Sequence, residues 1–240
     1  MASLDTPKLL VPVDVSTDSL PGDRLGDFLA GIDVVLLGYF PVPDQSLPAQ
    51  LKLNRGDEAA ARLNRISEQV QASGVAGSVE TELVFTHDRQ DPIDRVADEH
   101  ACDGVLVPGK TGPIERILVP LRGDLNLDRI LSFAGAVARH SGASLTLFHA
   151  VTDGDEDGEA LLATAAEQLT AGGLDDARLT RQVSEGDDSY AQIVEQGSAF
   201  DLIVLGETEP LLRERIFGSI PAKITGQTDS PVVVVRDPAA

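Results

Sequence analysis

Two stretches of the sequence decide the fold, Lys8-Leu-Leu-Val-Pro-Val-Asp14 and Arg116-Ile-Leu-Val-Pro-Leu-Arg122. They lie 108 residues apart, both are apolar, and both carry a proline at the same place. Two further pairs of runs match in the same order, 31–37 with 142–148 and 103–107 with 201–205. Three matching runs in one order indicate an internal repeat.

Amphipathic helical patterns lie between these apolar runs. In 59–70 and in 161–169, apolar residues recur at spacings of three and four, which is typical of a helix with one buried face. Short Val-, Ile- and Leu-rich runs that alternate with such helices predict an α/β fold, with parallel strands covered on both faces. The strands are predicted near 8–14, 32–40, 80–86, 103–107, 116–121, 143–151, 178–183, 201–205 and 231–236.

The first copy of the repeat is shorter than the second. After its fourth strand, only the six residues 110–115 precede the next copy, too few for a helix and a strand. The second copy continues with a predicted helix near 211–226 and a last strand near 231–236. We therefore predict two repeats, 1–112 and 113–240, of which the first lacks its last helix and strand. The other copy should cover the sheet edge that this leaves unpaired.

The order of these motifs resembles the universal stress protein family, in a tandem form. The resemblance is carried by the Leu-Val-Pro-Val-Asp-x-Ser start at 10–16, the strand at 201–206, the Gly218-Ser219 pair and the terminal run 230–235. It implies two Rossmann-like repeats of the adenine nucleotide alpha hydrolase-like type, with strand order 3-2-1-4-5. It also implies that the two copies pack against each other as a pseudo-dimer.

The same resemblance implies where a nucleotide would bind. Nucleotide-binding members place an aspartate at the end of the first strand, near the adenosine, and Asp14 matches it. Their phosphate loop follows the fourth strand, where Gly206, Gly218 and Ser219 match its first glycine, its last glycine and its hydroxyl. The first copy keeps Asp14 but has no such loop, because residues 110–115 lead directly into the second copy.

The second copy departs from this nucleotide-binding pattern. Arg122 stands where the first copy has Asp14, Glu209 stands at the middle glycine of the loop, and the loop is one residue shorter. A carboxylate about 4 Å from a phosphate oxygen costs roughly 1 kcal/mol in water and about 4 kcal/mol in a partly shielded crevice. We therefore predict a degenerate site, in which Glu207 and Glu209 replace the phosphate at the positive end of the last helix. If Arg122 and Arg213 face the crevice, an anion could still bind there.

The composition limits the partners. Asp and Glu total 39 against 19 Lys and Arg, a formal net charge of -20, which disfavours nucleic acid and membranes. A lysine-poor, acidic surface with few aromatic residues resembles proteins of extreme halophiles. A single cysteine, Cys102, excludes an internal disulfide and a multi-cysteine zinc site, and we expect no metal. Without a signal peptide or a long apolar run, we expect a cytoplasmic protein.

The sequence thus predicts a non-enzymatic universal stress protein, a stress-response regulatory or protein-interaction module without a cofactor. No nucleophile, base and orienting acid are arranged for hydrolysis. ATP or AMP binding in one surviving crevice is the alternative. An unknown protein partner is expected, and a homodimer stays open. The stretch 41–56 is interpreted as a loop that forms a lid or an interface, and His149, which matches Gly38 of the first copy, as a core or crevice-wall histidine.

Overall fold

The structure is a computed structural model that describes residues 6–17, 29, 31–72, 77–110, 112–123, 126–151, 158–185, 188–207 and 219–236, without the side chains of 219–222. The described strands are β1 (Lys8–Asp14), β2 (Asp33–Pro41), β3 (Val79–Thr86), β4 (Gly104–Val107), β5 (Arg116–Pro120), β6 (Ser144–Val151), β7 (Leu179–Glu185), β8 (Leu202–Gly206) and β9 (Val232–Val235). The described helices are α2 (Pro48–Ala72), α3 (Gln90–Glu99), α4 (Leu127–Ser141), α5 (Gly158–Ala171), α6 (Ser189–Gly197), α7 (Ser219–Thr228) and the short η1 (Asp176–Arg178). Every predicted strand is present, with bounds within two residues of those expected.

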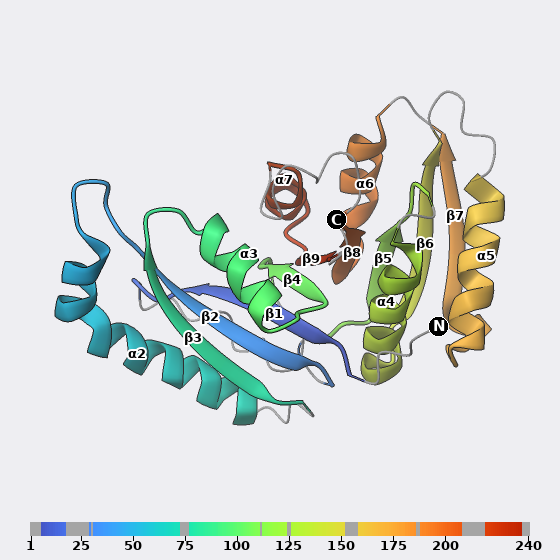
Figure 1. Ribbon diagram of the computed structural model, residues 1–240. Coiled ribbons are helices and arrows are strands. Elements are labelled where there is room, and N and C mark those ends of the chain that lie inside the picture. Colours follow the sequence, from blue (N-terminus) through green and yellow to red (C-terminus); the bar gives the residue numbers. More distant parts are fainter. Residues whose placement is uncertain are drawn as a thin grey trace.

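The strands form one nine-stranded sheet in the order β3-β2-β1-β4-β9-β8-β5-β6-β7 (Figure 1). All neighbouring pairs are parallel except β4 and β9, which are antiparallel. The first half of the chain thus supplies one side of the sheet and the second half the other. The predicted α/β fold with a mostly parallel sheet is confirmed.

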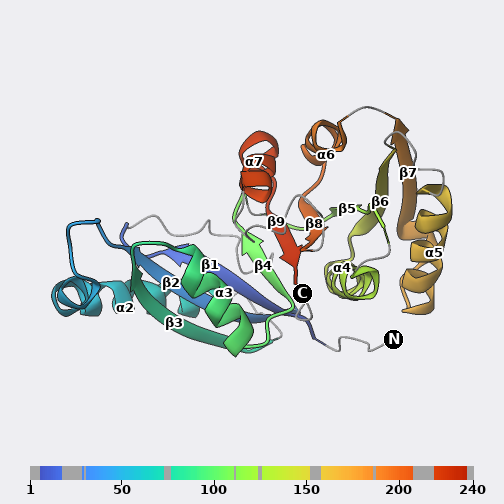
Figure 2. The same ribbon diagram turned by 45° about the horizontal axis from the view of Figure 1, so that its top comes forward.

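Helices cover both faces of this sheet, because successive residues of a buried parallel strand point to opposite faces and both sets are apolar. One core cluster joins the strands to α2, α4 and α5, and the other joins them to α3, α6 and α7. Figure 2 shows α6 and α7 next to each other on one side of β8 and β9, with α4 on the opposite side. Each fully buried Leu, Ile or Val contributes about 1.5–3 kcal/mol to this packing.

The two halves meet at the antiparallel pair of β4 and β9. All four residues of β4 pair with the four of β9, so β9 covers an edge that β4 would otherwise expose. Charged side chains reinforce the joint, since Arg236 contacts Asp98 at 2.8 Å and Arg129 contacts Asp103 at 3.2 Å. The Arg236 side chain is only 11% exposed, but that of Asp98 is 67% exposed, so water screens this pair as it does other surface ion pairs.

The interpretation of 41–56 as a loop is wrong. β2 ends at Pro41 and α2 begins at Pro48, so only residues 42–47 connect them. Proline suits the first turn of a helix, where its missing N–H has no partner to lose. The Ala-Gln-Leu-Lys-Leu run after Pro48 consists of good helix formers, which outweigh the cost of Gly56 inside the helix.

Candidate functional site

The first candidate crevice lies where β1 and β4 end side by side. Asp14, the last residue of β1, turns its carboxylate onto its own loop, and Oδ1 accepts hydrogen bonds from the Ser16 amide at 2.8 Å and the Ser16 hydroxyl at 2.6 Å. Arg62 of α2 donates to the Val15 and Ser16 carbonyls at 3.0 and 3.2 Å. Asp14 therefore helps to shape the loop after β1, at the place predicted for the adenosine-side acid.

The wall of this crevice after β4 contacts backbone from the second half. A Cβ added to Gly109 would lie 2.6 Å from backbone atoms of residues 229–231, the connection between α7 and β9. The Lys110 amide donates to the Asp229 carbonyl at 2.7 Å, and the Lys110 ammonium pairs with the Asp229 carboxylate. The 229–231 connection therefore fills the side of Gly109 on which any side chain would stand.

The second candidate crevice lies between the ends of β5 and β8. These strands are in register at Leu118 and Ile203. If this register continues beyond both strands, Arg122 lies opposite Glu207, the residue that follows Gly206. Both side chains are half-buried. An arginine thus stands where the first half has its acid, as the sequence comparison of the two halves predicts.

The remaining predicted site residues are only partly described. Arg213 and Gly218 lie outside the described residues, and so does Glu209. Ser219 is the first residue of α7, and only its backbone is described. The predicted contacts of Asp14, Arg122, Gly206, Arg213, Gly218 and Ser219 with an anion or nucleotide stay predictions.

His149 fills the inner wall of the second crevice. It is 1% exposed, and its Nδ1 lies 2.8 Å from the Leu121 carbonyl oxygen at the end of β5. A Cβ added to Gly158, the first residue of α5, would lie 2.3 Å from the His149 Cδ2. The interpretation of His149 as a core or wall residue is confirmed. In the first half, Gly38 has no side chain at this place, and a methyl group of Leu63 lies 3.0 Å from where its Cβ would be.

Sequence reasoning missed two close approaches in these walls, at Gly109 and at Gly158. The partner of Gly109 is in the other half of the chain, so no local pattern reveals it. Gly158 opens a helix that also follows an acidic, glycine-containing stretch, where glycine is unremarkable. The sequence shows Gly158 between an apolar strand and an amphipathic helix, but this position alone does not reveal that the glycine packs against His149.

Cys102 and Asp94 are two described residues whose side-chain pKa values are raised by burial. Burial raises the pKa of the Cys102 thiol to about 12, so the thiol stays protonated and is a poor nucleophile. Burial also raises the pKa of the Asp94 carboxyl, which accepts hydrogen bonds from the Gln90 amide group at 2.9 and 3.0 Å. In the described part of the chain, no group of three or more His, Cys, Asp or Glu side chains is placed to hold a metal ion. No described helix is both long and apolar enough to cross a lipid bilayer.

Comparison with known proteins decides the family. The model of the universal stress protein family matches residues 113–236, which is more than half of the 240 residues. The chain belongs to the universal stress protein family. None of the curated protein sequences compared with it is significantly similar.

Solved structures share the fold of this universal stress protein over nearly its whole length. A universal stress protein from Archaeoglobus fulgidus DSM 4304 is 18% identical, with a TM-score of 0.69 over 95% of this chain and 96% of its own. A protein of unknown function from Pseudomonas aeruginosa PAO1 is 17% identical, with a TM-score of 0.59 over 96% of this chain and 92% of its own. A universal stress protein in complex with cAMP matches 52% of this chain and 98% of its own at 23% identity, with a TM-score of only 0.44. At these identities the likeness concerns the fold alone.

Proposed function

We propose that this universal stress protein consists of two copies of one unit, 1–112 and 113–240, packed as a pseudo-dimer. Equivalent hydrogen bonds in the two halves support this division. In each half, an aspartate before the fourth strand accepts a bond from the amide of the first residue of the first strand. These bonds run from Lys8 to Asp103 at 2.9 Å and from Arg116 to Asp201 at 2.8 Å.

The backbone and the strand order agree with this proposal. Gly31 and Gly142, which precede the second strand of each half, have φ values of +76° and +78°, a conformation that glycine adopts without strain. Counted within each half, β7-β6-β5-β8-β9 corresponds to 3-2-1-4-5, and β3-β2-β1-β4 corresponds to 3-2-1-4. β9 thus stands beside β4 where a fifth strand of the first copy would otherwise stand.

The nucleotide site of each copy is degenerate in this proposal. The single observation that carries it is the packing of Gly109 against the 229–231 connection, with the Cβ position 2.6 Å from backbone atoms. In other family members, a glycine-rich loop after the fourth strand would give its amides to phosphate. Here the Lys110 amide is bonded to the Asp229 carbonyl, so it is not available to an anion.

In the second copy, side chains replace or fill the positions at which a nucleotide would bind. Arg122 replaces the adenosine-side acid, and His149 with Gly158 fills the wall beside Leu121. As the sequence analysis predicts, Glu207 and Glu209, of which the latter lies outside the described residues, would take the place of a phosphate at the positive end of the last helix. This self-capping predicts that Glu209→Gly raises the affinity for nucleotide.

The protein therefore acts as a non-enzymatic, cytoplasmic stress-response module that regulates or binds another protein and needs no cofactor. Its net charge of -20 suits a cell with molar salt, where the Debye length falls to about 3 Å. Such a charge also disfavours nucleic acid as the partner. The two crevices serve as packing surfaces in this proposal.

Mass spectrometry of small molecules released from freshly purified protein tests the proposal. We expect no ATP, AMP or other adenine nucleotide above a small fraction of the protein concentration. The control is the same protein mixed with equimolar ATP before release, which measures recovery. A nucleotide recovered at about one per chain would refute a degenerate pair of sites.

Binding of ATP or AMP in the first crevice is the alternative, because Asp14 is kept there and its side chain is half-buried beside Ser16. In that case, Asp14→Ala would abolish nucleotide binding measured by calorimetry, while Arg122→Ala would leave it unchanged. Unchanged binding in both variants would place the nucleotide in neither crevice. Phosphate release from ATP and magnesium, measured in parallel, tests for enzymatic activity, and we expect none above the buffer.

A further inference from the structure

Among the described strands, β7 forms an edge of the sheet that no further strand covers. β7 is the last strand in the sheet order, and among the described strands it pairs with β6 alone. The outer N–H and C=O groups of such an edge strand are a template for a further strand. Proteins protect edges with charged side chains, proline or a bulge. β7 carries the charged Arg181 and Glu185, but it contains no proline or lysine and pairs with β6 without interruption.

The opposite edge, β3, is poorly suited to pair with itself. Glu80 and Glu82 lie on this strand, where Lys8 contacts Glu80 at 3.1 Å and Arg95 contacts Glu82 at 2.8 Å. Two β3 strands side by side would bring four carboxylates together, and like charges opposite each other destabilise a strand pair. The two edges of this sheet therefore differ in their capacity for association.

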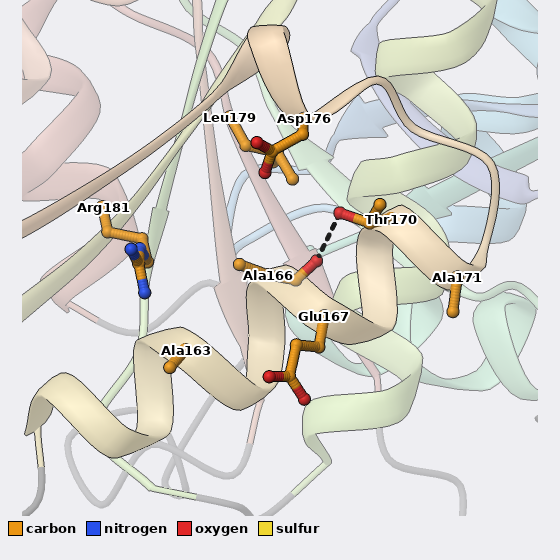
Figure 3. A pocket seen from close by; sticks show the side chains of 8 residues that line it. All are labelled: Ala163, Ala166, Glu167, Thr170, Ala171, Asp176, Leu179 and Arg181. Atoms are coloured by element: carbon orange, nitrogen blue, oxygen red, sulfur yellow. Dashed lines mark hydrogen bonds between the residues drawn. The ribbon is translucent and has the colours of Figure 1, made fainter.

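Arg181, Val183 and Glu185 alternate along the face of β7 that α5 covers. All three side chains are exposed, and the 39% exposure of Val183 is high for an apolar strand residue. Arg181 and Val183 line a cavity of about 620 Å³ between β7 and the start of α5. Arg181 also borders a second cavity of about 490 Å³, and Figure 3 shows its side chain extending from the strand toward α5.

We propose that a second copy of this chain pairs with β7 in antiparallel orientation, about a twofold axis through Val183. In this register, Arg181 of each copy lies opposite Glu185 of the other, so the interface contains the same opposite-charge pair twice. The two Val183 side chains meet at the axis and leave water. This inference goes beyond the proposed function, because neither crevice takes part in it.

The twofold registers through Gln182 and through Arg181 lack this complementarity. Opposite residues of an antiparallel pair have their side chains on the same face of the sheet. In a twofold pair of identical strands, some residue must therefore lie opposite its own copy, with the axis between the two. An axis through Gln182 places Arg181 opposite Val183 and Glu185 opposite Leu179, without a charge pair. An axis through Arg181 places the two guanidinium groups opposite each other. The sequence of β7 thus favours the axis through Val183.

Disulfide cross-linking tests the register. With the axis at Val183, the two Cβ atoms at this position lie about 4.5–5.5 Å apart, and oxidation of Val183→Cys should link two chains covalently. The control is Thr180→Cys, because the two copies of residue 180 would be six positions, or about 20 Å, apart. The native Cys102 is 4% exposed and serves in both variants as an internal background. Equal cross-linking in both variants, or none in Val183→Cys, would overturn the register.

Charge exchange tests the proposed pair in the full chain. By sedimentation in about 0.15 M KCl, where the Debye length of about 8 Å leaves charges in contact largely unscreened, Arg181→Glu or Glu185→Arg should raise the dimer Kd about tenfold. The double variant should return the Kd to within about threefold of the wild type. Arg65→Glu, the same charge change at an exposed position of α2, should have no effect.

Unchanged melting temperatures would exclude misfolding as the cause of a weaker dimer. A wild-type chain that stays monomeric at about 1 mM would contradict the proposal, as would a double variant no tighter than the single ones. Neither result bears on the nucleotide crevices, so the proposed function and the dimer can fail separately.

Discussion

The two candidate crevices, at the ends of β1 and β5, differ in the residues that the structure places beside them. In the first half, backbone from the other half, the 229–231 connection, packs against Gly109. In the second half, side chains of the same half, Arg122 and His149, occupy the positions that correspond to Asp14 and Gly38. Local side chains can be exchanged by substitution, whereas backbone that also joins two halves of a sheet cannot. The comparison therefore predicts that only the second crevice can be reopened by point mutations.

The largest effect is expected at the first crevice. Gly109→Ala places a methyl group 2.6 Å from backbone atoms at the joint of the two halves, and we expect a loss of about 3 kcal/mol in the free energy of unfolding. Gly123→Ala is the matched control, because nothing lies within 4 Å of its Cβ position. Urea unfolding measures both variants. An equally small loss of unfolding free energy in the two variants would mean that the backbone around Gly109 can shift to accommodate a methyl group.

A smaller effect is expected at the second crevice, because the obstacle there is a side chain. Gly158→Ala places a methyl group 2.3 Å from the His149 ring, and we expect a loss of about 1–2 kcal/mol. In a His149→Ala background, the same substitution should cost less than about 0.5 kcal/mol, because the ring is gone. A double-mutant cycle in urea measures this coupling. Additive effects would show that His149 does not limit the space at Gly158.

Features of the fold that depend on residues close together in the sequence could be predicted, whereas contacts between distant residues could not. The strands were predictable because apolar runs and their repetition are local, and the edge problem of the shortened first copy was visible in residues 110–115. The sequence also predicted that the other half would cover this edge, but not that β9 would do so in antiparallel orientation, since this pairing joins residues 104–107 to the distant residues 232–235. The start of α2 at Pro48 was missed because proline marks both loops and first helical turns.

The smallest expected effect is that of salt on the melting temperature. It does not distinguish the two halves, because it arises from the charge of the whole chain. From about 0.1 M to about 1 M KCl, the Debye length falls from about 10 to 3 Å, so the repulsion within a chain of net charge -20 weakens. We expect the melting temperature to rise by about 5 °C, roughly 1–2 kcal/mol for a chain of this size. The same series near the isoelectric point of 4.4 should show a smaller rise. A flat curve at neutral pH would refute the halophilic interpretation.

The central claim is that both nucleotide sites are degenerate and that only the second can be restored. Calorimetric titration of ATP into the wild type and into the double variant Arg122→Asp with Glu209→Gly tests it most directly. We predict no saturable binding below about 1 mM for the wild type, and at least about fivefold tighter binding for the variant, because Glu209→Gly removes a carboxylate that costs about 1–4 kcal/mol beside phosphate. Micromolar binding of ATP by the wild type, unchanged in the variant, would contradict the claim.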